Sequence, residues 1–128
     1  MRRHFSQFAD STMRETAPID DISEAIGTAA RDLFSHKLKA VMLYGSYARG
    51  DYCANSDVDF MLLVDLQPSQ LEVYRNAVSG IASEVSLKSD GCPLISIILQ
   101  DITTYERYKE SLPFFRNIAA EGIVIYAA

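Results

Sequence analysis

The chain has few cysteines, which cross-link a small protein, and few prolines and glycines, which interrupt its helices and strands. It contains two cysteines, four prolines and six glycines in 128 residues, and it has no tryptophan. Cys53 and Cys92 show neither Cys-x-x-Cys nor Cys/His spacing, which argues against a zinc site or a disulfide framework. We therefore expect two free thiols in loops, as in a reducing compartment, and a cytoplasmic protein.

Long apolar runs and an excess of basic residues are also missing. No apolar run reaches the roughly 18 residues of a transmembrane helix, and no apolar stretch follows the Met1-Arg2-Arg3-His4 start, so neither a membrane span nor a signal peptide is expected. The chain has 12 basic and 17 acidic residues, a net charge of −5. This balance argues against a broad nucleic-acid-binding face, but it leaves room for a local basic pocket that holds a triphosphate.

The composition is that of an ordinary globular domain, with 48% apolar and 23% charged residues. A chain of this length can bury a core without disulfides, so we expect one domain over 1–128, with 1–15 as a loose lead-in. Hydrophobic periodicity predicts helices at about 18–36, 68–86 and 103–120, the last interrupted near Pro113, and strands at about 40–44, 57–65, 94–99 and 123–126. The strand at 57–65 is apolar on both faces, which is typical of α/β layering.

A dense motif joins the first two predicted strands. It reads Tyr44-Gly45-Ser46-Tyr47-Ala48-Arg49-Gly50-Asp51 and then Ser56-Asp57-Val58-Asp59, with ten residues between Ser46 and Asp57. Glycine lets a backbone approach phosphate closely, and the Ser46 hydroxyl can donate a hydrogen bond to a phosphate oxygen. Arg49 falls on the same side of the turn, where its guanidinium can hold a phosphate through two bonds.

Two carboxylates stand at the start of the second strand. Asp57 and Asp59 are two residues apart, so they point to the same face, about 7 Å apart along the strand. They repel each other unless a cation lies between them, and Mg²⁺ is a cation that binds one or two carboxylates together with phosphate oxygens. Taken singly, an Asp-x-Asp is often a polar strand entry, a Gly-Ser is usually a turn and an arginine is usually solvated. Their joint spacing favours a nucleotide site.

The combined pattern resembles the minimal nucleotidyltransferases of the DNA polymerase beta superfamily. That family carries Gly-Ser, about ten residues, then Asp-x-Asp, with a further carboxylate on a later strand. The chain looks especially like the nucleotidyltransferase half of bacterial toxin–antitoxin pairs of the MntA type, whose toxin is a HEPN-domain ribonuclease. The resemblance covers about 40–126. The matching residues are Gly45, Ser46, Arg49, Gly50, Ser56, Asp57 and Asp59.

The resemblance implies a fold and a set of site residues. It implies an α/β (α+β) nucleotidyltransferase fold, in which a small mixed β-sheet has helices packed mainly on one side. It implies that the substrate is ATP or another nucleoside triphosphate. It further implies that Asp57 and Asp59 are catalytic and hold Mg²⁺. The implied nucleotide-binding residues are Gly45, Ser46, Arg49 and Ser56.

The chain departs from the family pattern at one position. The third carboxylate would fall on the strand at 94–99, and the matching residue is Ser96. A serine is neither a general base nor a strong Mg²⁺ ligand, and a base contributes roughly 10²–10⁴-fold to such a reaction. Asp90 and Asp101 flank the strand, but each is about five residues from Ser96.

The resemblance implies transfer of AMP from ATP to a hydroxyl, with a tyrosine of a cognate HEPN toxin as the acceptor and an antitoxin role for this chain. Ser96 motivates an alternative, a weakened module that binds nucleotide and partner without chemistry. A small antibiotic nucleotidyltransferase is a third reading, for which a homodimer could supply the drug site. The stretch from Tyr105 to Tyr108 is interpreted as an amphipathic helix face or as part of a partner interface.

Overall fold

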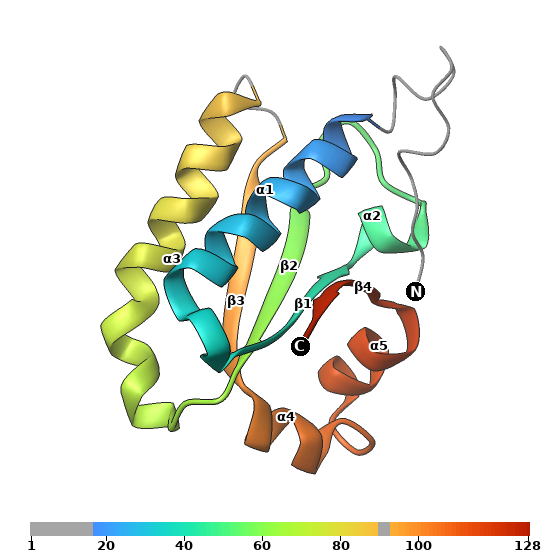
Figure 1. Ribbon diagram of the computed structural model, residues 1–128. Coiled ribbons are helices and arrows are strands. Elements are labelled where there is room, and N and C mark those ends of the chain that lie inside the picture. Colours follow the sequence, from blue (N-terminus) through green and yellow to red (C-terminus); the bar gives the residue numbers. More distant parts are fainter. Residues whose placement is uncertain (1–16, 90–92) are drawn as a thin grey trace.

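The computed structural model describes residues 17–89 and 93–128, in which helices alternate with the strands of one sheet (Figure 1). The predicted lead-in at 1–15, Asp90 and Cys92 lie outside the described residues. The elements are α1 (Ala17–Phe34), the 3-10 turn η3 (Ser35–Lys37), β1 (Leu38–Tyr44), α2 (Ser46–Arg49), β2 (Val58–Val64), α3 (Pro68–Lys88), β3 (Ile95–Asp101), α4 (Ile102–Tyr108), α5 (Pro113–Glu121) and β4 (Ile123–Ala127).

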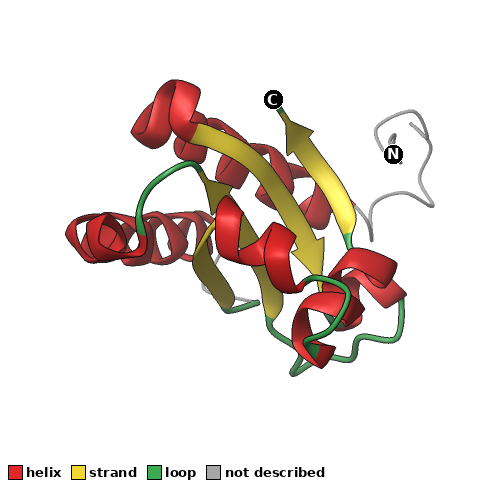
Figure 2. Ribbon diagram, turned by 90° about the horizontal axis from the view of Figure 1, so that it is seen from below, coloured by secondary structure: helices red, strands yellow, loops and turns green. Residues whose placement is uncertain are grey.

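The sheet is mixed, as expected. Its strand order is β3-β2-β1-β4, and β1 runs antiparallel to both β2 and β4. β2 and β3 are parallel, and the long helix α3 makes the crossover between them, because parallel neighbours need a connection of this length. Figure 2 shows the twisted sheet with helices on either side.

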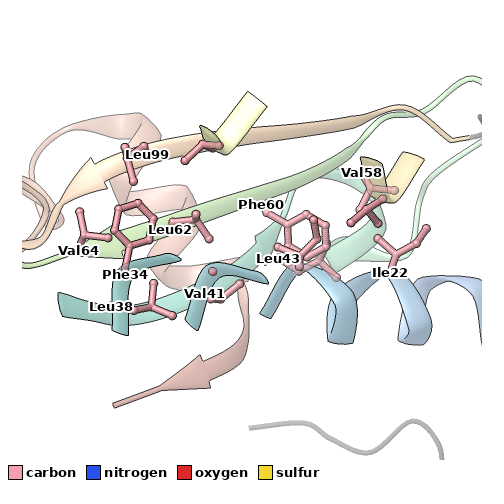
Figure 3. Close-up of a cluster of buried hydrophobic side chains, with 14 of the residues drawn as sticks. Ile22, Phe34, Leu38, Val41, Leu43, Val58, Phe60, Leu62, Val64 and Leu99 are labelled. Atoms are coloured by element: carbon pink, nitrogen blue, oxygen red, sulfur yellow. The ribbon is translucent and has the colours of Figure 1, made fainter. Parts of the chain in front are cut away.

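The two long helices, α1 and α3, cover one face of the sheet. Their apolar stripes meet alternate residues of β1 and β2, and Figure 3 shows these side chains gathered between helix and sheet. The buried members of this first core that Figure 3 labels are Ile22, Phe34, Leu38, Val41, Leu43, Val58, Phe60, Leu62, Val64 and Leu99. The expectation that the helices pack mainly on one side is confirmed for these two.

The short helices α4 and α5 cover part of the opposite face. There the intervening residues of β1 and β2 form a second, smaller core with the helices; its buried members are Met42, Met61, Leu63, Tyr105, Phe115 and Ile118. β2 is thus covered on both faces, which explains its continuous apolar run. Tyr105, read from sequence as an amphipathic helix face, is one of the buried anchors of α4.

The ends of the elements follow local chemistry. α3 begins at Pro68 with a capping box, in which the Gln67 backbone N–H donates to Gln70 Oε1 at 2.7 Å. α4 begins after Asp101, whose carboxylate Oδ2 accepts from the Thr104 backbone N–H at 2.8 Å. Predicted and observed ends differ by about two residues, since helix ends are set by such caps rather than by periodicity. None of the helices in the described part of the chain is long and apolar enough to cross a membrane.

Candidate functional site

Three strands bring the site together in one row. Asp59 of β2 is the register partner of Tyr44 on β1 and of Ser96 on β3. Register partners on neighbouring strands point to the same face of a sheet, so all three side chains share a face. Met61 and Leu63, which follow Asp59 at a spacing of two, belong to the core under α4 and α5. The row therefore lies on the face that α4 and α5 partly cover.

The two aspartates present the negative charge of the site. Asp57 is exposed, just before β2, and Asp59 is half-buried on it. Burial raises the pKa of Asp59 above its ordinary value, the charge of Asp57 raises it further, and the positive charge of Arg49 partly opposes the rise. The two carboxylates thus repel each other, which is the electrostatic condition that a bound cation relieves.

Gly45 places the strand end directly against Asp59. Its φ of 79° and ψ of −157° lie in a region that is essentially restricted to glycine. A Cβ at this position would collide with Asp59 Oδ2 and would lie 3.3 Å from Asp59 Cγ. Gly45 is therefore required twice, by its own backbone and by its carboxylate neighbour.

The short helix α2 continues from Gly45. The backbone N–H groups of Ala48 and Arg49 both donate to the Gly45 carbonyl, at 3.1 and 3.0 Å. Ser46 is the first residue of this helix, and its carbonyl accepts from Gly50 at 2.9 Å. The tight turn after β1 that the motif predicts is present, with Ser46 directly after the glycine that approaches Asp59.

Arg49 extends from α2 between acidic groups. Its Nε is 3.1 Å from Asp51 Oδ2, and its Nη1 is 3.6 Å from Glu121 Oε1 at the end of α5. The hydrogen bond and charge of Asp51, with a smaller contribution from Glu121, raise the pKa of Arg49, so the guanidinium stays charged. All three side chains remain between two-fifths and two-thirds exposed, so these pairs are screened by solvent and can exchange for a phosphate.

The loop that leads into Asp57 is closed by local hydrogen bonds. The Cys53 backbone N–H donates to Ser56 Oγ at 2.9 Å, and the Ser56 N–H donates to the Cys53 carbonyl at 3.0 Å. The Tyr47 and Tyr52 rings stack at 4.1 Å and join this loop to α2. In this state the Ser56 hydroxyl holds the loop in shape, a role that its sequence position alone did not indicate. Cys53 is a free thiol, as predicted.

Asp101 is not the missing third carboxylate. It pairs with Val64 at the far end of β2, whereas Ser96 pairs with Asp59. Its Oδ2 caps α4, and its Oδ1 accepts from Gln100 Nε2 at 3.1 Å. Asp101 is 3% exposed and structural, so Ser96 is the β3 residue beside Asp59.

Two residues of α5 contact the candidate site, and sequence reasoning gave neither of them a role. Glu121 meets Arg49 only through the packing of α5, far away along the chain. Phe114 at the start of α5 makes an edge-to-face contact with Tyr44, with ring centroids 5.7 Å apart. Burial, and then the charge of Asp59, raises the pKa of Tyr44 to about 12, so this phenol stays neutral beside the aspartates.

The donor set fits a magnesium–triphosphate substrate. Among residues 17–89 and 93–128 no group of three or more histidine, cysteine, aspartate or glutamate side chains could hold a metal by itself. Two adjacent carboxylates are what Mg²⁺ uses when phosphate oxygens and water complete its shell. Asp57 and Asp59 would hold the ion, with Ser46 and Arg49 on the side where a triphosphate would extend.

Known proteins are similar to this chain in sequence. Residues 30–128 match the model of the family described as polymerase beta, nucleotidyltransferase. A protein of Methanocaldococcus jannaschii assigned as a protein adenylyltransferase is 43% identical over 72 residues, which cover 56% of this chain and 67% of that protein.

Two solved structures share the fold. A Sulfolobus solfataricus protein assigned as a nucleotidyltransferase has a TM-score of 0.57 at 17% identity, covering 94% of this chain and 92% of its own. A toxin–antitoxin structure with AMP-PNP has a TM-score of 0.51 at 21% identity, covering 83% and 73%. The chain belongs to the polymerase beta nucleotidyltransferase family.

Proposed function

We propose that this protein is a Mg²⁺-dependent adenylyltransferase that moves AMP from ATP to a tyrosine hydroxyl of a HEPN-domain toxin and thereby acts as its antitoxin. The observation that carries the transferase part is the contact of the Gly45 turn with the Asp59 carboxylate. This contact joins a phosphate-binding turn to a metal-binding pair. The name of the M. jannaschii relative supports a protein acceptor, and the toxin–antitoxin structure with AMP-PNP supports an ATP-type donor and a toxin partner.

The reaction places distinct demands on the residues. The acceptor oxygen forms a bond to the α-phosphorus, the bond from that phosphorus to the oxygen bridging the β-phosphate breaks, and pyrophosphate leaves. When bound, Mg²⁺ would neutralise charge on the triphosphate. Asp57 and Asp59 would hold the ion, and Gly45 and Ser46 would receive the phosphates at the start of α2. Arg49 would exchange Asp51 and Glu121 for a phosphate oxygen. The hydroxyl proton passes to solvent, since the β3 neighbour of Asp59 is a serine.

The proposed location of the protein is the cytoplasm. A free thiol at Cys53 and the use of ATP are both compatible with that compartment.

Label transfer from ATP tests this function. The protein is incubated with Mg²⁺, ATP labelled on the α-phosphate and a HEPN-domain toxin as the candidate acceptor. We expect the label to appear on that partner, and to disappear when the partner's tyrosines are replaced by phenylalanine. Label retained on the phenylalanine variant would contradict the tyrosine acceptor, and a complete lack of label at saturating ATP would contradict transfer.

Ser96 favours one second candidate, a module that binds nucleotide and toxin without turnover. Asp59 has a carboxylate two residues earlier in the chain, at Asp57, but a serine on the neighbouring strand β3. A serine leaves the acceptor hydroxyl without a base. Under this function, calorimetry shows Mg–ATP binding while the labelling experiment shows no transfer.

Replacing Ser96 with aspartate is expected to speed transfer at least tenfold. The new carboxylate lies beside Asp59 in the register and can accept the hydroxyl proton, and tenfold corresponds to about 1.4 kcal/mol of activation free energy. The apo variant should melt at a lower temperature because a third negative charge joins the pair, and Mg²⁺ should reverse that loss. Ser96→Asn is the matched uncharged control. Unchanged transfer together with a melting temperature insensitive to Mg²⁺ would place Ser96 outside the reaction.

A further inference from the structure

An exposed aromatic ring stands beside the aspartate pair. Phe114, in the first turn of α5, is 47% exposed although it is large and apolar. Its ring meets the Tyr44 ring edge to face, with centroids 5.7 Å apart at 89°. Tyr44 is in turn the register partner of Asp59. An exposed phenylalanine is thereby linked through one residue to the proposed metal-binding carboxylate.

The residue next to Phe114, not Phe114 itself, anchors α5 in the core. Phe115, the next residue, is 8% exposed and fills the second core, where its ring lies 5.3 Å from that of Tyr105. The rings of Phe114 and Phe115 are 6.0 Å apart. Phe115 therefore anchors α5, while Phe114 is held at a set place with much of its ring open to solvent.

We propose that Phe114, held by Tyr44, is the surface on which the nucleobase of the donor triphosphate stacks. This inference rests on the proposed function and names the part of the substrate that the aspartates, Ser46 and Arg49 do not contact. Every base has an aromatic face, so a single ring binds all four with a preference for the larger purines.

The order of Tyr44, Asp59 and Ser96 across the sheet favours the nucleobase, not the acceptor, as the group that contacts Phe114. The acceptor hydroxyl has to approach beside Asp59 at the third position, which Ser96 occupies on the β3 side. Tyr44 and Phe114 lie on the opposite, β1 side of Asp59. That side is where β1 leads into the Gly45 turn, so a base there belongs to the same molecule as the phosphates.

Calorimetry with two ligands separates stacking from phosphate binding. Mg–ATP and Mg–tripolyphosphate, which has no base, are titrated into the wild type, Phe114→Ala and Phe114→Leu. We expect Phe114→Ala to raise the Kd for Mg–ATP about tenfold and to leave that for tripolyphosphate unchanged. Phe114→Leu, which keeps an apolar side chain without an aromatic face, should lose part of the ATP affinity. Tyr108→Ala is the control, because Tyr108 is an exposed aromatic residue (38%) on α4.

The other possible results of these titrations each contradict a different part of the proposal. Equal weakening of both ligands, or full ATP affinity in either Phe114 variant, would overturn the stacking assignment. Unchanged ATP binding with loss of transfer to the protein acceptor would make the ring a contact for the partner and overturn it as well. A wild type that binds tripolyphosphate as tightly as ATP removes the base site but keeps the phosphate site. A wild type that binds neither ligand defeats the proposed function itself, and this inference with it.

Discussion

Replacing Asp57 and Asp59 together with asparagine is expected to abolish the Mg²⁺-dependent rise in melting temperature that ATP gives the wild-type protein. The two carboxylates interact, since burial and then the charge of Asp57 raise the pKa of Asp59. An amide keeps the shape of the side chain but carries no charge to attract the ion. Label transfer should fall below detection for the same reason.

The apo form of this double variant should be at least as stable as the wild type. At neutral pH the ionised Asp59 is disfavoured by burial and by Asp57, so removing both charges relieves a repulsion in the folded state. The measurement is a thermal melt with and without Mg–ATP. Asp65→Asn is the control, since Asp65 is an exposed aspartate just past the other end of β2. An undiminished ATP-induced rise in the double variant would reject the metal assignment.

Replacing Gly45 with alanine should destabilise the protein by about 1–3 kcal/mol and reduce transfer on the order of 100-fold. The backbone angles of Gly45 are costly for any residue with a Cβ. The added methyl group would also displace the Asp59 carboxylate that it meets, and a catalytic group moved by about 1 Å can lose roughly that much rate.

Gly50 provides the matched control for this prediction. It also has a positive φ, of 87°, but a Cβ there would meet nothing within 4 Å. Gly50→Ala should therefore be destabilised by about 1 kcal/mol, from backbone strain alone, and should keep most of its transfer activity. Urea unfolding gives the stabilities and label transfer gives the rates. Equal loss of transfer in the two variants would show that the contact between Gly45 and Asp59 does not matter for the reaction.

These variants test two different properties of the candidate site. The aspartate variants test whether the negative charges are needed to bind Mg²⁺, and the glycine variants test whether the turn must hold the Asp59 carboxylate in place. Gly45, Asp57 and Asp59 all belong to one short stretch from the end of β1 to the start of β2, which explains why one motif carries so much of the candidate site.

The order of helices and strands and the interaction between the charges of Asp57 and Asp59 could be predicted from the sequence. Both depend on short-range rules: hydrophobic spacing along a helix, and alternation of side chains along a strand. The α/β class followed from the apolar run of β2, and the expected turn after β1 is present. The exact ends of the elements were less accurate, because caps such as Asp101 act through one or two hydrogen bonds.

Only the tertiary structure decided which distant residues meet at the site. Strand pairing placed Ser96 beside Asp59 and assigned Asp101 to the opposite end of the sheet. The packing of α5 brought Glu121 to Arg49 and Phe114 to Tyr44. No local pattern encodes these contacts, because register and helix docking depend on how whole apolar faces fit together. The motif by itself thus picked out the Gly45 turn and the aspartate pair, and the fold determined which residues surround them.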